Sequence, residues 1–157
     1  MIDYQRLFHT GLVVEDLQAS MDALQSALGL TWATPNHFDG LPLWTPETGL
    51  EHIDLVATYS CEGPQHVELI QGLASGVYTP LPGPAVHHVG VWVDDVPAEV
   101  AALCSKGWVV SAAGACPEDG YGLFVYLDHP GSTMRLELVS TALVDAFENW
   151  WAGGTLG

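Results

Sequence analysis

The chain carries one sequence pattern twice, and this internal repeat limits the folds that are open to it. Residues 8–30 read FHTGLVVEDLQASMDALQSALGL, and residues 87–108 read HHVGVWVDDVPAEVAALCSKGW. Each copy has a His, a short apolar run, an acidic pair, an amphipathic segment and a glycine. In both copies the His precedes an Asp of the acidic pair by seven residues. A pattern that returns at matched spacing indicates one supersecondary unit used twice.

Each copy is typical of a strand followed by a helix. The apolar runs 12–14 and 89–93 have strand length and are rich in β-branched residues. Asp16 and Asp95 suit the N-cap of a helix, and a glycine suits the left-handed position that ends it. Apolar residues then recur at helical spacing. They are Leu17, Met21, Leu24 and Leu28 in the first copy and Val96, Val100 and Leu103 in the second.

Three candidate strands follow each helix, so each half of the chain has the order βαβββ. The segment 34–50 contains three prolines, and we expect most of it to be loop. The sequence therefore predicts an α+β fold made of two βαβββ modules. The expected strands are 31–33, 53–59 and 67–71 in the first half and 108–112, 123–128 and 134–139 in the second.

The two modules should pack as one compact domain, because 157 residues with 48% hydrophobic content can bury a single core. We place the first module at 1–78 and the second at 84–141. The proline-rich segment between them is stiff and cannot pair in a sheet. A C-terminal helix and tail follow at 142–157, and the helix has an apolar stripe of Leu143, Phe147 and Trp150.

The charge balance excludes several partners. Three basic residues stand against nineteen acidic ones, for a formal net charge of −16. Nucleic acids and anionic membranes require cationic patches, so we expect neither as a partner. The acidic surface either serves solubility alone or attracts cationic ligands. The three cysteines have neither metal-site spacing nor an even number for disulfides, which favours reduced thiols and a cytoplasmic location.

Strand alternation selects one His and one Glu from each repeat. The apolar neighbours of Glu68 and of Glu137 would face a helix, so both carboxylates should point to the opposite side. His9 and His88 share that side on the first strand of each module. Two imidazoles and two carboxylates suit one divalent ion: zinc, nickel, cobalt, manganese or iron(II). A buried core histidine and a solvent-facing glutamate are the alternatives for each residue taken singly.

The same alternation gives candidates for binding a substrate. Arg135 could hold a substrate carboxylate or phosphate, or it could pair with Glu137 or Asp128. Asp54 would point inward if its apolar neighbours faced a helix, and an exposed strand position is the alternative. The remaining candidates are aromatic residues that could line a pocket or belong to the core, namely Trp92, Phe124 and Tyr126.

Four segments carry a family resemblance: FHTGLVVEDL, HVELIQ, HHVGVWVDDV and RLELV. They resemble the marker segments of the vicinal oxygen chelate superfamily, which contains glyoxalases, bleomycin-resistance proteins and dioxygenases. The similarity extends from about Phe8 to Val139, and the nearest branch contains methylmalonyl-CoA epimerase. It implies a glyoxalase-like half-open barrel, a homodimer with a complete site in each chain, and one divalent metal. The implied metal ligands are His9, Glu68, His88 and Glu137.

The resemblance also implies a reaction class. The expected activity is that of an isomerase, epimerase or lyase acting on a small carbonyl or thioester substrate through a metal-stabilised enolate. Glu137 is the expected base, and Glu68 or Asp54 is its partner on the opposite face of the substrate. The Glu at position 68 is closer to the lactoylglutathione lyases than to the epimerases, which often carry Gln there. His87 falls on the helix side by strand parity.

Two other functions are compatible with the same fold. An antibiotic-binding resistance protein would use the barrel as a crevice, and an acidic, Trp-rich chain suits a cationic aromatic ligand. A non-haem iron dioxygenase would use two His and one carboxylate and leave positions open for oxygen.

Overall fold

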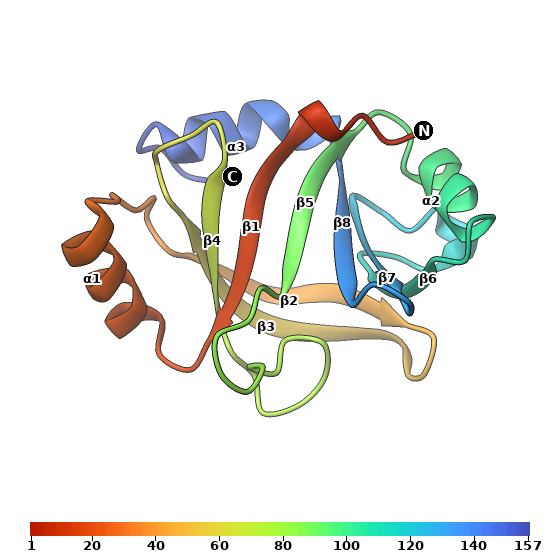
Figure 1. Cartoon of the computed structure of the whole chain (residues 1–157), viewed down its shortest axis with the longest axis horizontal. Coiled ribbons are helices and arrows are strands. Elements are labelled where there is room, and N and C mark those ends of the chain that lie inside the picture. The colour runs from red at the N-terminus through yellow and green to blue at the C-terminus, as the bar shows by residue number, and fades with distance from the viewer.

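Eight strands close into one mixed barrel, with two helices outside it and a third across one end (Figure 1). The computed structural model describes all residues, 1–157. The helices are α1 (Leu17–Leu28), α2 (Val96–Cys104) and α3 (Val144–Trp151). The strands are β1 (Leu7–Val14), β2 (Asn36–Thr45), β3 (Gly49–Tyr59), β4 (His66–Gln71), β5 (His88–Val93), β6 (Val109–Ala113), β7 (Phe124–His129) and β8 (Met134–Ser140).

The two halves of the barrel have the same strand order. Around the barrel the strands run β1-β4-β3-β2-β6-β7-β8-β5. In each half the first strand pairs in parallel with the last, β1 with β4 and β5 with β8. The halves join along β1 and β5, which are antiparallel, and through the single residue pair Trp44–Ala113 between β2 and β6. The predicted α+β fold is confirmed. The family resemblance implied a half-open barrel, and the narrow second junction closes it.

The helices begin where the acidic residues predict. The Asp16 side chain accepts a hydrogen bond from the Ala19 N–H at 2.9 Å, and Asp95 accepts one from Ala98 at 3.0 Å. Each bond satisfies a backbone donor that the first helical turn leaves free. At the end of α1, Gly29 adopts the left-handed conformation (φ 71°). The C-terminal helix begins with a 3-10 turn, Thr141–Leu143, before α3.

One element differs from the sequence prediction. The segment 34–50, expected to be mostly loop, contains β2 and the start of β3. The predicted strand 31–33 contributes only an isolated bridge between Trp32 and Ser60. β2 tolerates Pro42 because it is almost an edge strand, paired along its length with β3 alone and with β6 at one point.

Apolar side chains pack on both faces of the sheet. Val96, Val100 and Leu103 of α2 are buried against the outer face of the second half. In contrast α1 buries only Leu17, and Leu28 is 66% exposed. Inside the barrel the apolar residues surround the cavity described below. No helix combines the length and apolar character needed to cross a membrane.

Candidate metal centre and pocket

Four buried side chains meet inside the barrel: His9, Glu68, His88 and Glu137. One ligand atom from each lies within 4.8 Å of the other three. The two imidazole Nε2 atoms are 2.8 Å apart. The Oε2 atom of Glu137 lies 3.0 Å from His9 Nε2, and that of Glu68 lies 3.0 Å from His88 Nε2. The cluster is therefore formed within a single chain.

The register of the strands explains this convergence. His9 on β1 lies opposite Gly90 on β5, and Gly11 lies opposite His88. On the outer neighbours, Glu68 of β4 lies opposite Gly11, and Glu137 of β8 lies opposite Gly90. Two rows thus cross the junction of the halves, each with a Glu and a His on either side of a glycine.

Gly11 and Gly90 leave the space that the imidazoles occupy. A Cβ atom at Gly11 would lie 1.9 Å from Cε1 of His88, and one at Gly90 would lie 1.8 Å from Cε1 of His9. No side chain fits at such distances. Neither glycine was predicted from the sequence, although each repeat has one two residues after its ligand His.

The cluster suits a divalent ion. The Oε2 atoms of both glutamates are buried and have no hydrogen-bond partner, which is costly unless a cation satisfies them. The separations between donor atoms, 2.8 to 3.5 Å, match neighbouring ligands on one ion, since bonds of about 2.1 Å at right angles place donors roughly 3.0 Å apart.

Electrostatic interactions shift the pKa values of His88 and Glu137. Burial alone would lower the pKa of His88, but the adjacent carboxylates of Glu137 and Glu68 outweigh burial and raise it to about 9. Burial likewise opposes the charged form of Glu137, and the two imidazoles more than offset it and hold the pKa of that carboxyl well below its usual range. The site is therefore built to carry positive charge between two carboxylates.

His87 lies next to the cluster and contacts His88. Strand parity suggested the helix side, but the residue is buried beside the metal centre, with its Nδ1 atom 2.8 Å from Nδ1 of His88. Its Nε2 lies 2.8 Å from the Val77 carbonyl. Burial, together with the charge of His88, lowers the pKa of His87 to about 4, so it is neutral. The Nδ1 atoms of His87 and His88 can share one proton across this contact, and such a hydrogen bond fixes the orientation of a ligand imidazole.

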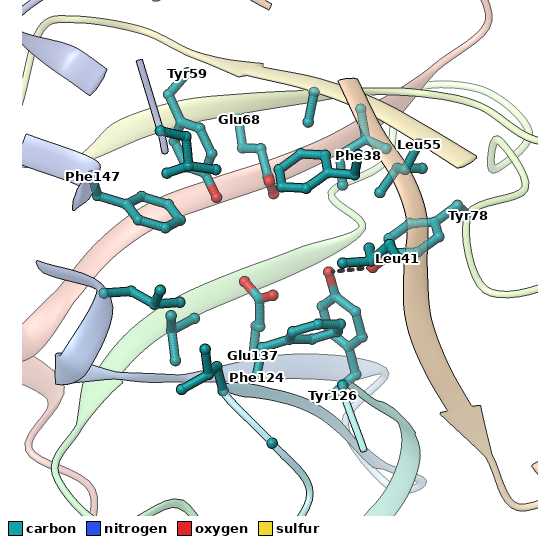
Figure 2. Close-up of a pocket in the computed structure, with 18 of the residues that line it drawn as sticks. Phe38, Leu41, Leu55, Tyr59, Glu68, Tyr78, Phe124, Tyr126, Glu137 and Phe147 are labelled. Atoms are coloured by element: carbon teal, nitrogen blue, oxygen red, sulfur yellow. Dashed lines mark hydrogen bonds between the residues drawn. The ribbon is translucent and has the colours of Figure 1, made fainter. Parts of the chain in front are cut away.

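A cavity of about 350 Å³ opens on the two carboxylates. Figure 2 shows Glu68 and Glu137 reaching toward one another from opposite walls. Three tyrosines, Tyr59, Tyr78 and Tyr126, add the only other titratable groups to its lining. The remaining wall is apolar and includes Phe38, Leu41 and Leu55 from β2 and β3, and Leu143, Phe147 and Trp150 from the C-terminal segment.

Of the other predicted substrate-binding residues, only some line the cavity. Tyr126 and Phe124 line the cavity. Trp92 does not, because it stacks on Phe8 at 3.8 Å and packs edge-on to Phe147. Asp54 is exposed on the outside of β3 and accepts a hydrogen bond from the Gly40 N–H. The inward position expected for Asp54 is wrong, since no helix covers β3 and its apolar residues face the interior instead.

Arg135 pairs with Asp128, which was the predicted alternative to binding a substrate. Its guanidinium makes two hydrogen bonds to Asp128, at 2.6 and 2.9 Å, and lies 2.9 Å from Nε2 of His87. It lines a separate hollow of about 260 Å³, outside the main cavity. Three parts of the cavity wall were not predicted as site residues: Tyr59, Tyr78 and the residues from α3. None of them lies in a segment that the repeat pattern marks.

With this geometry in place, comparison with known families gives a clear result. Residues 8–126 match the sequence model of the glyoxalase/bleomycin resistance protein/dioxygenase superfamily. The chain belongs to this superfamily. Proteins of the superfamily generally bind a divalent metal, and the His/Glu cluster could hold one. No curated protein matches the chain by sequence.

Several solved structures share the fold of this chain. A methylmalonyl-CoA epimerase variant from Streptomyces coelicolor, in complex with 2-nitronate-propionyl-CoA, has a TM-score of 0.60 at 18% identity and covers 87% of this chain and 94% of its own. The Mycobacterium tuberculosis methylmalonyl-CoA epimerase has a TM-score of 0.56 at 16% identity, covering 89% and 92%. A variant of 4-hydroxymandelate synthase from Streptomyces coelicolor has a TM-score of 0.53 at 14% identity, covering 86% of this chain and 47% of its own. These likenesses establish the fold and match the epimerase-containing branch.

Proposed function

We propose that this superfamily member is a divalent-metal-dependent isomerase, epimerase or lyase that moves a proton on the carbon next to a substrate carbonyl. The observation that carries the proposal is the pair of buried, unpartnered carboxylate oxygens beside two imidazoles at the wall of the cavity. His9, Glu68, His88 and Glu137 would hold the ion. A divalent ion bound there supplies Lewis-acid polarisation of a carbonyl oxygen, which acidifies the adjacent C–H.

The chain's own carboxylates would move the proton. Glu137 would accept it from the substrate carbon, because its side chain reaches into the cavity. Glu68 reaches in from the opposite wall (Figure 2). A carbon between them would have a carboxylate on each face, as removal from one side and return on the other require. Asp54 has no such position, since it lies outside the barrel.

The test is proton exchange in heavy water. Metal-reconstituted protein would be incubated with a neutral α-hydroxyketone, a glutathione hemithioacetal and an acyl-CoA thioester, and deuterium at the carbon beside the carbonyl would be followed by mass spectrometry. We expect exchange with at least one compound, and a loss of about 100-fold or more in Glu137→Gln. The exposed Glu148→Gln is the matched control, and metal content is measured in every sample. Exchange undiminished in metal-loaded Glu137→Gln, or no exchange by the wild type with any compound, would contradict the proposal.

A ligand-sequestering protein is the second candidate, favoured by the aromatic lining of the cavity and the net charge of −16. Such a protein would bind a cationic aromatic drug equally well with and without metal. Calorimetry with cationic glycopeptide and aromatic polyketide drugs separates the two functions, because the isomerase proposal predicts no metal-independent tight binding.

A further inference from the structure

The polar groups of the cavity are confined to one zone. Fifteen of its twenty lining residues are hydrophobic, and no Lys or Arg is among the twenty. The carboxylates of Glu68 and Glu137 and the tyrosine hydroxyls lie in the middle of the cavity, with aromatic rings to either side (Figure 2). A ligand that fills this space must therefore be apolar apart from the part that meets this zone.

None of the three basic residues of the chain is free to bind an anionic ligand at the cavity. Arg6 is held by Asp94 at 2.9 Å and Arg135 by Asp128 at 2.6 Å. The third basic residue, Lys106, follows α2 on the outside of the barrel. A protein with a net charge of −16 and no free cation at the cavity repels a polyanionic carrier. Two carboxylates also balance a divalent ion, so the loaded site would carry no net charge to attract an anion.

Tyr78 and Tyr126 form a donor pair next to the carboxylates. Their hydroxyl oxygens are 3.3 Å apart, and both side chains are almost wholly buried, at 3% and 2% exposed. Phenols are protonated near neutral pH, so both hydroxyls can donate. Because two hydroxyls share one hydrogen bond, one O–H is left to donate to something else. The Tyr126 ring packs edge-on to His88 with centroids 5.0 Å apart, which keeps the pair close to the metal ligands.

The flanking rings favour an aryl group on the ligand. Phe124 packs edge-on to Tyr126, and Phe147 packs edge-on to Tyr59, with centroids 5.8 and 5.4 Å apart. These pairs border the polar zone from opposite sides of the cavity, and Phe38 adds a third ring (Figure 2). Aromatic edges and faces of this kind pack well against a flat ring.

We infer that the cavity takes an uncharged aryl carbonyl compound with a second oxygen on the neighbouring carbon, and that the Tyr78–Tyr126 pair donates a hydrogen bond to this second oxygen. Coenzyme A esters and glutathione adducts are excluded as substrates by the absence of basic groups. This inference rests on the proposed function for the role of the oxygen pair, and the experiment below separates the two.

The experiment is calorimetric binding to metal-loaded protein, which does not require turnover. The probes are α-hydroxyacetophenone, its para-carboxylate derivative, S-lactoylglutathione and propionyl-CoA. We expect α-hydroxyacetophenone to bind at least about tenfold more tightly than each charged probe. In Tyr126→Phe and Tyr78→Phe its affinity should fall about 5- to 20-fold. Acetophenone, which lacks the second oxygen, should lose less than threefold in either variant.

Tyr4→Phe is the control, since Tyr4 is 63% exposed and far from the cavity. Thermal unfolding confirms that each variant is folded. Binding of any charged probe as tightly as the neutral ketone, or no binding of the neutral ketone, would overturn the inference. Selective binding of the ketone without proton exchange would instead refute only the proposed reaction. Proton exchange confined to propionyl-CoA or the glutathione compound would refute the substrate class and leave the reaction standing.

Discussion

The metal centre requires two glycines as well as its four ligands, because the glycines leave space for the imidazoles. The Gly90 Cα lies where any side chain would collide with the imidazole of His9, and Gly11 stands in the same relation to His88. Gly90→Ala should therefore displace His9 and lower metal affinity by more than about 100-fold. Competition with a fluorescent zinc chelator measures this change. The control is Gly131→Ala in the exposed β7–β8 turn, where affinity should stay within twofold; unaltered affinity in Gly90→Ala would contradict the packing argument.

His87 gives a second prediction at this scale. It is the partner of His88 on the side away from the proposed ion, at 2.8 Å. Replacing it with Leu removes that hydrogen bond and frees the ring of His88 to turn, so metal affinity should fall about 10- to 100-fold. His52→Leu, at an exposed position on β3, should bind metal like the wild type. Equal affinities in the two variants would show that His87 has no part in positioning His88.

Which side chains could be predicted depends on what covers each strand. Alternation placed Glu68 and Glu137 inward, because a helix packs against the outside of each strand, α1 on β4 and α2 on β8. The same rule failed for Asp54, since β3 has no helix over it and turns its apolar residues inward. Strand parity gives the two faces of a strand, but only tertiary packing decides which face is inside.

At the scale of elements, the helices and seven of the eight strands could be predicted, and β2 could not. Its three nearby prolines indicate a loop, and its stability comes from pairing with β3, a contact that no local pattern encodes. The part that α3 has in the cavity wall could not be predicted either. An apolar stripe predicts that the helix packs on something, but not that it closes the cavity through Phe147 and Trp150.

Trp150 is the residue on which the docking of α3 depends. It is 1% exposed, and its indole N–H donates to the Thr34 carbonyl at 2.7 Å. Trp150→Ala should lower the free energy of unfolding by about 3–5 kcal/mol, from lost burial and an unpaired carbonyl. Urea denaturation measures the loss. Leu28→Ala, at the exposed end of α1, should change stability by less than about 0.5 kcal/mol. A loss below about 1 kcal/mol for Trp150→Ala would mean that α3 is not firmly packed.

For the whole molecule, metal binding should be linked to pH. In the metal-free protein the pKa of His88 is about 9, so its imidazole is protonated near neutrality. An ion must displace that proton, and affinity should rise about tenfold per pH unit up to roughly pH 9 and then level off. Calorimetry at about pH 7.5, in buffers of different ionisation enthalpy, should show at least one proton released per ion. Metal binding without proton release would contradict the charge state assigned to His88.

The most direct test of the account is the metal content of the protein itself. Mass spectrometry of tag-free protein, reconstituted in turn with zinc, nickel, cobalt, manganese and iron(II), should find about one equivalent of at least one of these metals per chain. The same measurement on His88→Ala and Glu137→Ala should find that equivalent lost from both. No stoichiometric metal in the wild type after reconstitution, or full retention in both variants, would contradict the assignment of His9, Glu68, His88 and Glu137 as one metal centre.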